Sequence, residues 1–302
     1  MNTETRAPSP LLNPVDRFPR APFPMQRQPW PGLASKMTPR PDQGEQSYRG
    51  SGRMLGRKAL VTGGDSGIGA ATAIAFAKEG ADVAINYLPE EEADAQAVVA
   101  AIRAAGRKAT TIPGDLRDEA FCKKLVDEAV AALGGLDTVT NIAGRQQAID
   151  SIEALSSDDF DATFKTNVYA MFWIVKAALP HLKPGSVIIN TTSEQGYNPD
   201  PYLLDYASTK AAIANFTKAL AKQLAPRGIR VNAVAPEPIW TPLQISGGAP
   251  DAKIPQFGAQ TPLGRAGQPV ELAPVYVTLA QSDLSYGTGL IWGDTGGNPG
   301  PG

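Results

Sequence analysis

The chain has 302 residues, of which 42% are hydrophobic and 19% charged, so it can bury the core of one large domain or two smaller ones. A formal net charge of −2 gives no reason to expect nucleic acid or an anionic membrane as a partner. One cysteine, Cys122, and one histidine, His181, exclude an internal disulfide and argue against a zinc site built on these residues. No apolar run reaches the roughly 20 residues of a membrane span, and no secretory signal opens the chain, so we expect a cytoplasmic protein.

The first 50 residues differ in composition from the rest. They contain ten prolines among Arg, Gln and Ser, with no helical or strand period. Such a segment cannot bury enough surface to fold alone, so it is either a disordered tail or an extended arm on the body or on a neighbouring subunit. We expect the first 20 residues to be mobile and residues 21–50 to form an arm, because these carry the apolar residues Phe23, Met25, Trp30 and Met37.

A glycine-rich turn follows the first predicted strand, residues 58–62. It reads Gly-Gly-Asp-Ser-Gly-Ile-Gly over residues 63–69 and leads into a predicted helix over 70–79. Glycines let a backbone turn tightly and approach a pyrophosphate, and a helix N-terminus offers free N–H groups to it. The spacing matches neither Gly-x-Gly-x-x-Gly nor a P-loop. A turn that binds no ligand therefore stays the alternative.

Strands and helices alternate along the rest of the chain. Further strands are predicted at residues 82–86, 108–112, 136–141, 186–192, 229–235 and 290–292, and helices at 90–105, 118–133, 157–181, 206–225 and 271–280. This pattern predicts one α/β domain over residues 51–302, built on a Rossmann-like, doubly wound parallel sheet. Ligands bind such sheets beyond the carboxyl ends of the strands. The glycine turn, Asp115, residues 141–144, Ser193 and residues 236–241 all fall there.

The stretch from residue 236 to 267 is rich in Pro and Gly and long for a connection in a compact domain. Loops of that length usually bind or cover a ligand. We expect a substrate loop or lid, and a surface excursion or subunit contact is the alternative.

Tyr206 and Lys210 stand four residues apart at the start of an Ala-rich predicted helix, so they share a helix face. A nearby cation lowers a tyrosine's pKa from its usual value of about 10, which would make Tyr206 a general acid/base near neutral pH. An isolated Tyr-x-x-x-Lys is more often an ordinary helix surface. The pair gains weight only from the motifs around it.

Four ordered motifs resemble those of the classical short-chain dehydrogenases/reductases. Thr62-Gly63-x-x-x-Gly67-Ile-Gly69 is similar to the family's cofactor turn, and Asn141-Ile-Ala-Gly144 to its Asn-Asn-Ala-Gly strand end. Ser193, thirteen residues ahead of Tyr206-x-x-x-Lys210, looks like the catalytic serine, and Asn167 falls at the place of the catalytic asparagine. The resemblance covers residues 50–297. The Pro-rich arm narrows it to the bacterial branch labelled glucose/ribitol dehydrogenase-like.

The resemblance implies an NAD(P)-dependent oxidoreductase that moves hydride between the nicotinamide and an alcohol or carbonyl substrate. Tyr206 would exchange the substrate proton, Ser193 would hydrogen-bond the reacting oxygen, Lys210 would hold the nicotinamide ribose and lower the Tyr206 pKa, and Asn167 would support a water relay. No metal is needed. The cofactor would further contact Gly63, Asp65, Ser66, Gly67, Ile68, Gly69, Asn86, Tyr87, Asp115, Leu116, Asn141, Ala143, Gly144, Pro236, Ile239 and Thr241.

Two residues depart from the family pattern. Ile142 replaces the usual second Asn, which removes one side-chain hydrogen bond near the cofactor. Glu237 stands where the family usually has Gly, beside the nicotinamide. Its side chain either strains the turn and brings a carboxylate toward the ring, or points to solvent.

The cofactor type depends on the end of the second predicted strand. An acidic residue there binds the ribose 2′-OH and repels a 2′-phosphate, whereas an Arg does the reverse. The chain has Asn86-Tyr87, then Glu90, Glu91 and Glu92, with Asp65 in the glycine turn and no Lys or Arg placed to pair a phosphate. This charge pattern favours NAD(H) over NADP(H).

The substrate class stays open between a sugar or polyol and a small or apolar aldehyde or ketone. The expected lining is Arg145, Gln146, Gln195, Tyr197, Tyr202 and Trp240. Two other functions fit the same motifs: a non-catalytic nucleotide-binding protein, and a cofactor-dependent isomerase or epimerase. Members of the family are commonly tetramers, so the resemblance implies a homotetramer.

Overall fold

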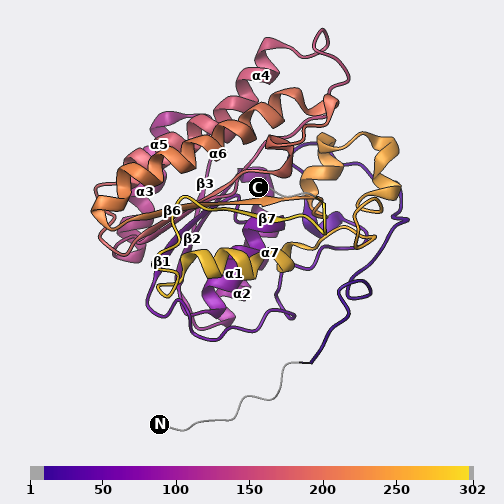
Figure 1. The fold of residues 1–302 in the computed structure, drawn as a ribbon. Helices are drawn as coiled ribbons and strands as arrows, with labels where there is room; N and C mark the ends of the chain where they lie inside the picture. The colour runs from indigo at the N-terminus through magenta and orange to yellow at the C-terminus, as the bar shows by residue number, and fades with distance from the viewer. Residues whose placement is uncertain (1–9, 299–302) are drawn as a thin grey trace.

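Seven parallel strands form a single sheet in the computed structural model, which describes residues 10–298. The strand order is β3-β2-β1-β4-β5-β6-β7 (Figure 1). The strands are β1 (Lys58–Thr62), β2 (Asp82–Tyr87), β3 (Ala109–Pro113), β4 (Thr138–Asn141), β5 (Val187–Thr191), β6 (Arg230–Pro236) and β7 (Ile291–Asp294). The predicted Rossmann-like, doubly wound sheet in one domain is confirmed.

Helices cover both faces of this sheet (Figure 1). One layer holds α1 (Gly67–Lys78), α2 (Glu92–Ala104) and α7 (Pro269–Ala280), and the other holds α3 (Glu119–Leu133), α4 (Ser157–Phe164), α5 (Ala170–Ala178) and α6 (Leu204–Leu224). Because both faces are covered, the central strands are apolar on both sides. In β1, Ala59 and Val61 join the core under α1, while Leu60 between them joins the core under α3.

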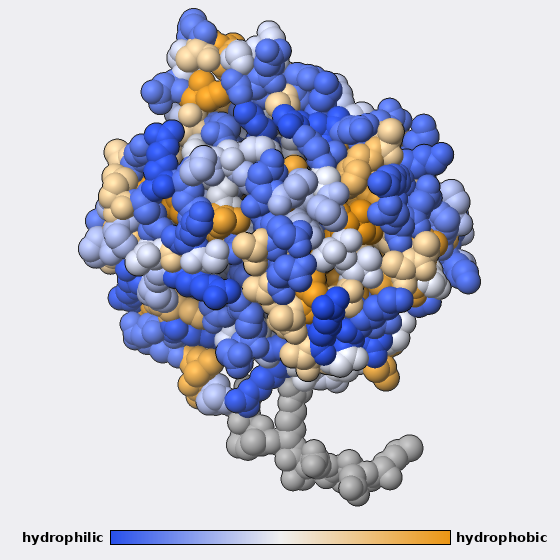
Figure 2. Space-filling view, turned by 180° about the vertical axis from the view of Figure 1, so that it is seen from behind, coloured by the Kyte–Doolittle hydropathy of each residue, from blue (hydrophilic) through white to orange (hydrophobic). Residues whose placement is uncertain are grey.

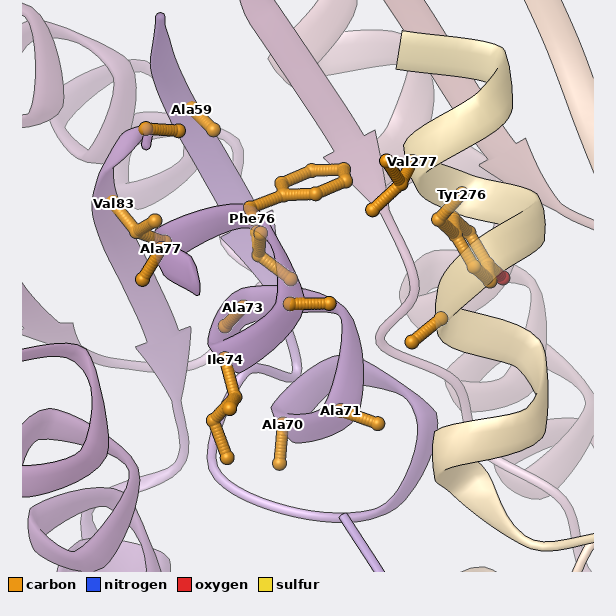
Figure 3. Packing of buried hydrophobic residues seen from close by; sticks show 14 of the residues in the cluster. Ala59, Ala70, Ala71, Ala73, Ile74, Phe76, Ala77, Val83, Tyr276 and Val277 are labelled. Carbon is orange, nitrogen blue, oxygen red and sulfur yellow. The ribbon is translucent and has the colours of Figure 1, made fainter. Parts of the chain in front are cut away.

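Small side chains let α1 lie close to α7. Figure 3 shows the alanines of α1, with Ile74 and Phe76, beside Tyr276 and Val277 of α7. Phe76, Ile74 and Tyr276 are fully buried. This packing fixes the first turn of α1, which follows directly from the glycine turn.

The strand order reverses at β1, whose neighbours are β2 and β4. From β1 the chain continues to β2 and β3 on one side, then crosses to β4 and continues to β7 on the other side. Open α/β sheets bind ligands at the point between two such strands, here β1 and β4. Thr62 pairs in register with Asn141, and Asn141 pairs with Asn190 of β5. The loops that carry the predicted motifs therefore start at one edge of the sheet.

The single helix predicted over residues 157–181 is wrong in one respect. The structure has α4, then a π-helical turn over Lys165–Tyr169, then α5. Hydrophobic periodicity does not reveal this turn, because a turn of five residues is too short to show in the pattern of the whole helix. Such turns inside helices often occur at functional sites.

The N-terminal segment lies along the body. Phe23 stacks on Trp240 with 4.3 Å between ring centroids, and the Trp240 indole donates to the Pro39 carbonyl at 2.9 Å. Main-chain bonds join Phe23 to Pro255 and Gln28 to Ile245 at 2.9 Å each. The segment thus packs on the 236–267 loop, which contains two short helical segments, Gln244–Gly248 and Asp251–Gln256. Of the first 20 residues, which we expected to be mobile, 1–9 lie outside the described part of the chain.

Within residues 10–298, no helix combines the length and the hydropathy that a bilayer crossing requires. The face in Figure 2 is mostly hydrophilic, with hydrophobic residues scattered over it.

Candidate active site

Thr62, the last residue of β1 before the glycine turn, links the ends of β1 and β4. Thr62 Oγ1 accepts hydrogen bonds from the backbone N–H groups of Ile142 at 3.0 Å and Ala143 at 3.2 Å. A Cβ on Gly69 would overlap the Gly63 carbonyl, so the first turn of α1 can approach the strand end only with glycine there. The N-terminus of α1 consequently opens onto the switch point of the sheet.

A cleft follows this edge, and most of the predicted cofactor residues line it. These are Gly63, Asp65, Ser66, Gly67, Ile68, Gly69, Asn86, Tyr87, Asp115, Leu116, Ala143, Gly144 and Thr241. The cleft has glycines at a helix N-terminus, and its lining extends from the end of β1 to the end of β4. Both features suit a dinucleotide. Asn141 lies beneath the cleft, where its Nδ2 donates to Asn190 Oδ1 at 2.9 Å and its own Oδ1 is buried without a partner in the described chain. The residues present therefore fit a nicotinamide dinucleotide.

The cleft also has walls that the sequence analysis missed. Trp30 and Pro31 of the N-terminal segment line it, together with Leu88, Glu91, Gly114, Ile142, Thr166, Pro242 and Leu243. Gln43 reaches the glycine turn itself, because its Oε1 accepts from the Gly67 backbone N–H at 2.8 Å. From the sequence alone, Trp30 is only one of the apolar residues of the N-terminal segment. No periodic pattern links it to the glycine turn.

Three acidic side chains gather beside the cleft. Asp65, Glu91 and Asp94 are all buried, and burial raises the pKa of Asp65 and of Glu91. Besides burial, the charge of the neighbouring Asp65 helps to raise the Glu91 pKa, to about 9. Asp94 instead accepts from the backbone N–H groups of Ala34 and Ser35, at 2.5 and 3.2 Å. The cleft therefore carries less negative charge than its acidic residues suggest.

Two predicted cofactor residues use their polar side-chain atoms in hydrogen bonds within the protein. Asn86 Nδ2 donates to the carbonyls of Ile112 and Gly114, at 3.0 and 3.2 Å, which ties β2 to the end of β3. Asp115 forms a bidentate pair with Arg117, with one contact at 2.6 Å. The uncharged Asn86 amide thus holds the strand end and adds no charge to the cleft.

Tyr206 and Lys210 lie on one face of α6, both buried. Lys210 Nζ is 5.2 Å from the centre of the Tyr206 ring and donates to the Thr191 carbonyl at 2.9 Å. Burial lowers the Lys210 pKa to about 7. Burial also raises the Tyr206 pKa, against a hydrogen bond with Ser193 that lowers it. The expected lowering of the Tyr206 pKa by Lys210 is absent, since burial dominates both groups.

Ser193 is held against α6 by a close approach. A Cβ on Gly196 would lie 2.9 Å from the Ala211 backbone nitrogen, so this segment packs on α6 only with glycine. Ser193 Oγ accepts from the Gln195 backbone N–H at 3.2 Å and reaches the Pro236 carbonyl at 3.4 Å. The hydroxyl consequently sits between α6 and the end of β6.

Asn167 lies in the π-helical turn and faces the same region. Its Oδ1 accepts from the Arg145 backbone N–H at 2.7 Å, and its Nδ2 donates to the Arg145 carbonyl and to Thr209 Oγ1, each at 3.0 Å. A Cβ on Gly144 would meet both Asn167 Oδ1, at 3.6 Å, and Lys210 Nζ, at 3.8 Å. Asn167 and Lys210 therefore flank the same short segment after β4.

A second pocket opens beside Tyr206. It contains Ser193, Tyr206, Pro236, Glu237 and Ile239, and shares Ile68, Thr241 and Leu243 with the cleft. Of the lining predicted for the substrate, Gln146, Gln195 and Tyr202 belong to it. Trp240 lies instead in the core formed with Phe23, and Arg145 pairs with Asp159 at 2.6 Å. Tyr197 is 39% exposed and does not line this pocket.

Comparison with known proteins finds similar sequences and structures. A family model described as enoyl-(acyl carrier protein) reductase matches residues 63–297. The chain is 60% identical to the "Uncharacterized oxidoreductase YhxD" of Bacillus subtilis over 96% of this chain and 98% of that one. It is 44% identical to "NADPH-dependent aldehyde reductase 1, chloroplastic" of Arabidopsis thaliana, over 88% and 94% of the two chains. A short-chain dehydrogenase of Burkholderia cenocepacia, solved with NADP, aligns with a TM-score of 0.76 and 38% identity over 81% and 98%.

These relatives correct the predicted cofactor preference. We expected NAD(H) over NADP(H), but the Burkholderia structure holds NADP and the Arabidopsis relative is NADPH-dependent. The expectation counted acidic residues near the end of β2 as repelling a 2′-phosphate. In the structure burial raises the pKa of both Asp65 and Glu91, and Asn86 is uncharged. The charge argument for NAD(H) therefore fails.

All three relatives are named as oxidoreductases, dehydrogenases or reductases, the solved one shares the fold, and the family model covers well over half of the chain. The matched residues include the glycine turn, Ser193, Tyr206 and Lys210. The chain therefore belongs to the classical short-chain dehydrogenase/reductase family of oxidoreductases.

Proposed function

We propose that the protein is an NADP(H)-dependent reductase or dehydrogenase acting on an aldehyde or ketone and the corresponding alcohol. One observation carries the proposal: the pocket that holds Tyr206 and Ser193 meets the cofactor cleft at Ile68, Thr241 and Leu243. A proton donor and a hydride donor can therefore act on one carbonyl group from adjoining spaces. The NADPH-dependent relative supports the choice of cofactor.

When bound, the nicotinamide supplies hydride to the carbonyl carbon or accepts it from the alcohol carbon. In the reductive direction, Tyr206 donates its phenolic proton to the carbonyl oxygen as that oxygen gains charge. Ser193 donates a hydrogen bond to the same oxygen, which stabilises the developing charge. Lys210, whose ammonium faces the Tyr206 ring, would hold the cofactor ribose, and Asn167 positions the segment after β4.

The assay uses the purified full chain with NADPH and a panel of short aldehydes, followed at the nicotinamide absorbance. Turnover with several aldehydes is the expected result. Tight NADPH binding without any turnover would support the non-catalytic alternative. Conversion of an alcohol to its epimer without net change in cofactor would support the isomerase alternative.

We also propose that the protein is a cytoplasmic homotetramer. Phe160, Tyr169 and Phe172 on the α4–α5 stretch are each more than 40% exposed, which suits a subunit contact. The single cysteine supports a reducing compartment. Light scattering of wild type and of Phe172→Glu tests the assembly, since a charge at this contact should lower the mass. Cell fractionation tests the compartment.

A further inference from the structure

The substrate pocket contains a carboxyl group, that of Glu237, which the proposed proton and hydride transfers do not use. Glu237 is half-buried in the pocket lining, and Glu194, 4% exposed, lies beside it outside that lining. Like charges repel, so the contact with Glu194 disfavours a charge on Glu237. Burial, followed by this contact, raises the pKa of Glu237. Glu237 Oε2 is buried and receives no N–H or hydroxyl bond from the described chain.

Glu237 adopts an unstrained backbone. No non-glycine residue in the described part of the chain has a positive φ, so a side chain at this position costs the turn nothing. Its backbone N–H donates to the Asp294 carbonyl at 3.1 Å, at the end of β6. The carboxyl is thus a stable part of the pocket wall.

Gln195 joins Glu237 to a network of polar side chains in the pocket lining. Gln195 Nε2 donates to Glu237 Oε1 at 2.8 Å, and Gln195 Oε1 accepts from the Asp200 backbone N–H at 2.7 Å. Tyr202 donates to Asp200 Oδ2 at 2.6 Å, and Lys253 Nζ lies 3.9 Å from Asp200 Oδ1. Every member lines the pocket that also contains Ser193 and Tyr206.

Apolar side chains form another part of the lining, those of Leu203, Leu243, Ala249 and Phe257. A ligand in this pocket therefore meets both polar groups and hydrocarbon. Lys253 is the one cation in the described lining, and it lies beside Asp200, so it is already paired with a carboxylate.

We propose that Glu237 selects carbonyl substrates that carry hydroxyl groups next to the reacting carbon, such as short hydroxyaldehydes, over plain aliphatic aldehydes and over phosphorylated ones. This inference rests on the proposed reductase function. A substrate hydroxyl donates to the Glu237 carboxyl, whereas an analogue without it leaves a buried acceptor unpaired. A phosphate group meets no free cation in this lining, because Lys253 is paired with Asp200.

The test compares kcat/KM with NADPH for glyceraldehyde, propanal and glyceraldehyde 3-phosphate, three aldehydes of equal carbon number. Wild type should prefer glyceraldehyde over each of the others by at least about tenfold. Glu237→Leu, which removes the acceptor but keeps side-chain volume, should bring the glyceraldehyde/propanal ratio close to one. Glu237→Gln keeps an acceptor but cannot ionise, so the phosphate comparison is made at pH 9, above the raised pKa of Glu237. It should retain most of that ratio and discriminate several-fold less against the phosphate.

Glu90→Gln, an exposed carboxylate outside the pocket, is the matched control and should leave both ratios at the wild-type values. If wild type reduces none of the aldehydes, the proposed function fails. If it reduces them but both ratios survive in the Glu237 variants, this inference fails and the reductase stands. Should Glu237→Leu not fold, as judged by circular dichroism, the phosphate ratio of Glu237→Gln decides the matter alone.

Discussion

Gln43 accepts a hydrogen bond from the backbone N–H of Gly67 at 2.8 Å, so the N-terminal segment reaches the first turn of α1. That N–H is one of the unpaired donors with which a helix N-terminus binds phosphate. Nearby, Trp30 and Pro31 line the cleft opposite the glycine turn. The segment before β1 therefore forms part of the cofactor cleft, although it lies outside the α/β sheet.

Replacing Trp30 with alanine should weaken cofactor binding. The indole is a wall of the cleft, and loss of an aromatic contact to a nucleotide costs roughly 1–3 kcal/mol. We expect the Kd for NADPH, measured by isothermal titration calorimetry, to rise about fivefold or more. Tyr286→Ala removes a fully exposed aromatic residue far from any cleft and should not change it. An unchanged Kd in Trp30→Ala would exclude the segment from cofactor binding.

The Asp65→Asn variant should increase the preference for NADPH over NADH. Asp65 lies in the cleft with Asn86 and Tyr87, at the strand end where the adenosine ribose of a dinucleotide binds in this fold. Its carboxyl still shares negative charge with Glu91. Removing that charge should lower the Kd for NADPH several-fold more than the Kd for NADH.

Glu90→Gln serves as the control for this variant, because Glu90 follows the same strand but is exposed. It should leave the ratio of the two Kd values at the wild-type level. A ratio that stays constant in Asp65→Asn would mean that the 2′-phosphate binds elsewhere in the cleft.

Much of the fold follows from local pattern. Residues 58–62 and 187–191 are short apolar runs bounded by glycine and polar residues, which is the pattern of a strand buried on both faces. The loop after each such strand ends at the same edge of the sheet, so Gly63, Asn141 and Ser193 could be placed together. The spacing of Tyr206 and Lys210 predicted their shared face on α6, and the structure has it.

The missed features depend on contacts between distant segments. Trp30 reaches the cleft because the proline-rich segment packs on the 236–267 loop through Phe23 and Trp240, which no periodicity shows. The protonation of the Asp65–Glu91 pair depends on burial, which residue counts do not measure. Asn86 turns its amide toward β3, although its place at the strand end pointed to the cofactor.

Tyr206→Phe should lower kcat/KM for aldehyde reduction by about 10²–10⁴-fold, the usual contribution of a positioned proton donor. The change removes one oxygen from a buried ring, so the fold and the cofactor cleft should persist. Stopped-flow reduction with NADPH measures the rate, and calorimetry checks that NADPH still binds. Tyr286→Phe makes the same change on an exposed ring and should react like wild type. Near-wild-type turnover by Tyr206→Phe would assign the proton transfer to another group.

Ionisation of Glu79 should make the stability of the folded protein depend on pH in the acid range. Its carboxylate, at the end of α1, accepts from the Tyr48 hydroxyl at 2.7 Å, the Ser51 N–H at 2.8 Å and the Arg53 guanidinium at 2.8 Å. Burial raises its pKa, but the bonds from Arg53, Tyr48 and Ser51 outweigh burial and lower the pKa to about 2. The unfolded chain takes up a proton near the usual value of about 4.3, so the folded state is favoured above that pH.

Between pH 4.5 and 2 this stabilisation should be lost, and the wild-type melting temperature should fall more steeply than that of Glu79→Gln. At pH 7, Glu79→Gln should reduce the free energy of unfolding by roughly 3 kcal/mol, because it leaves Arg53 without its buried partner. Glu128→Gln, which breaks only an exposed pair with Lys124, should change it by less than about 0.5 kcal/mol. Denaturant titration at both pH values measures these differences. Parallel melting curves for wild type and Glu79→Gln below pH 4.5 would show that this carboxylate is not the acid-sensitive tie between the N-terminal segment and α1.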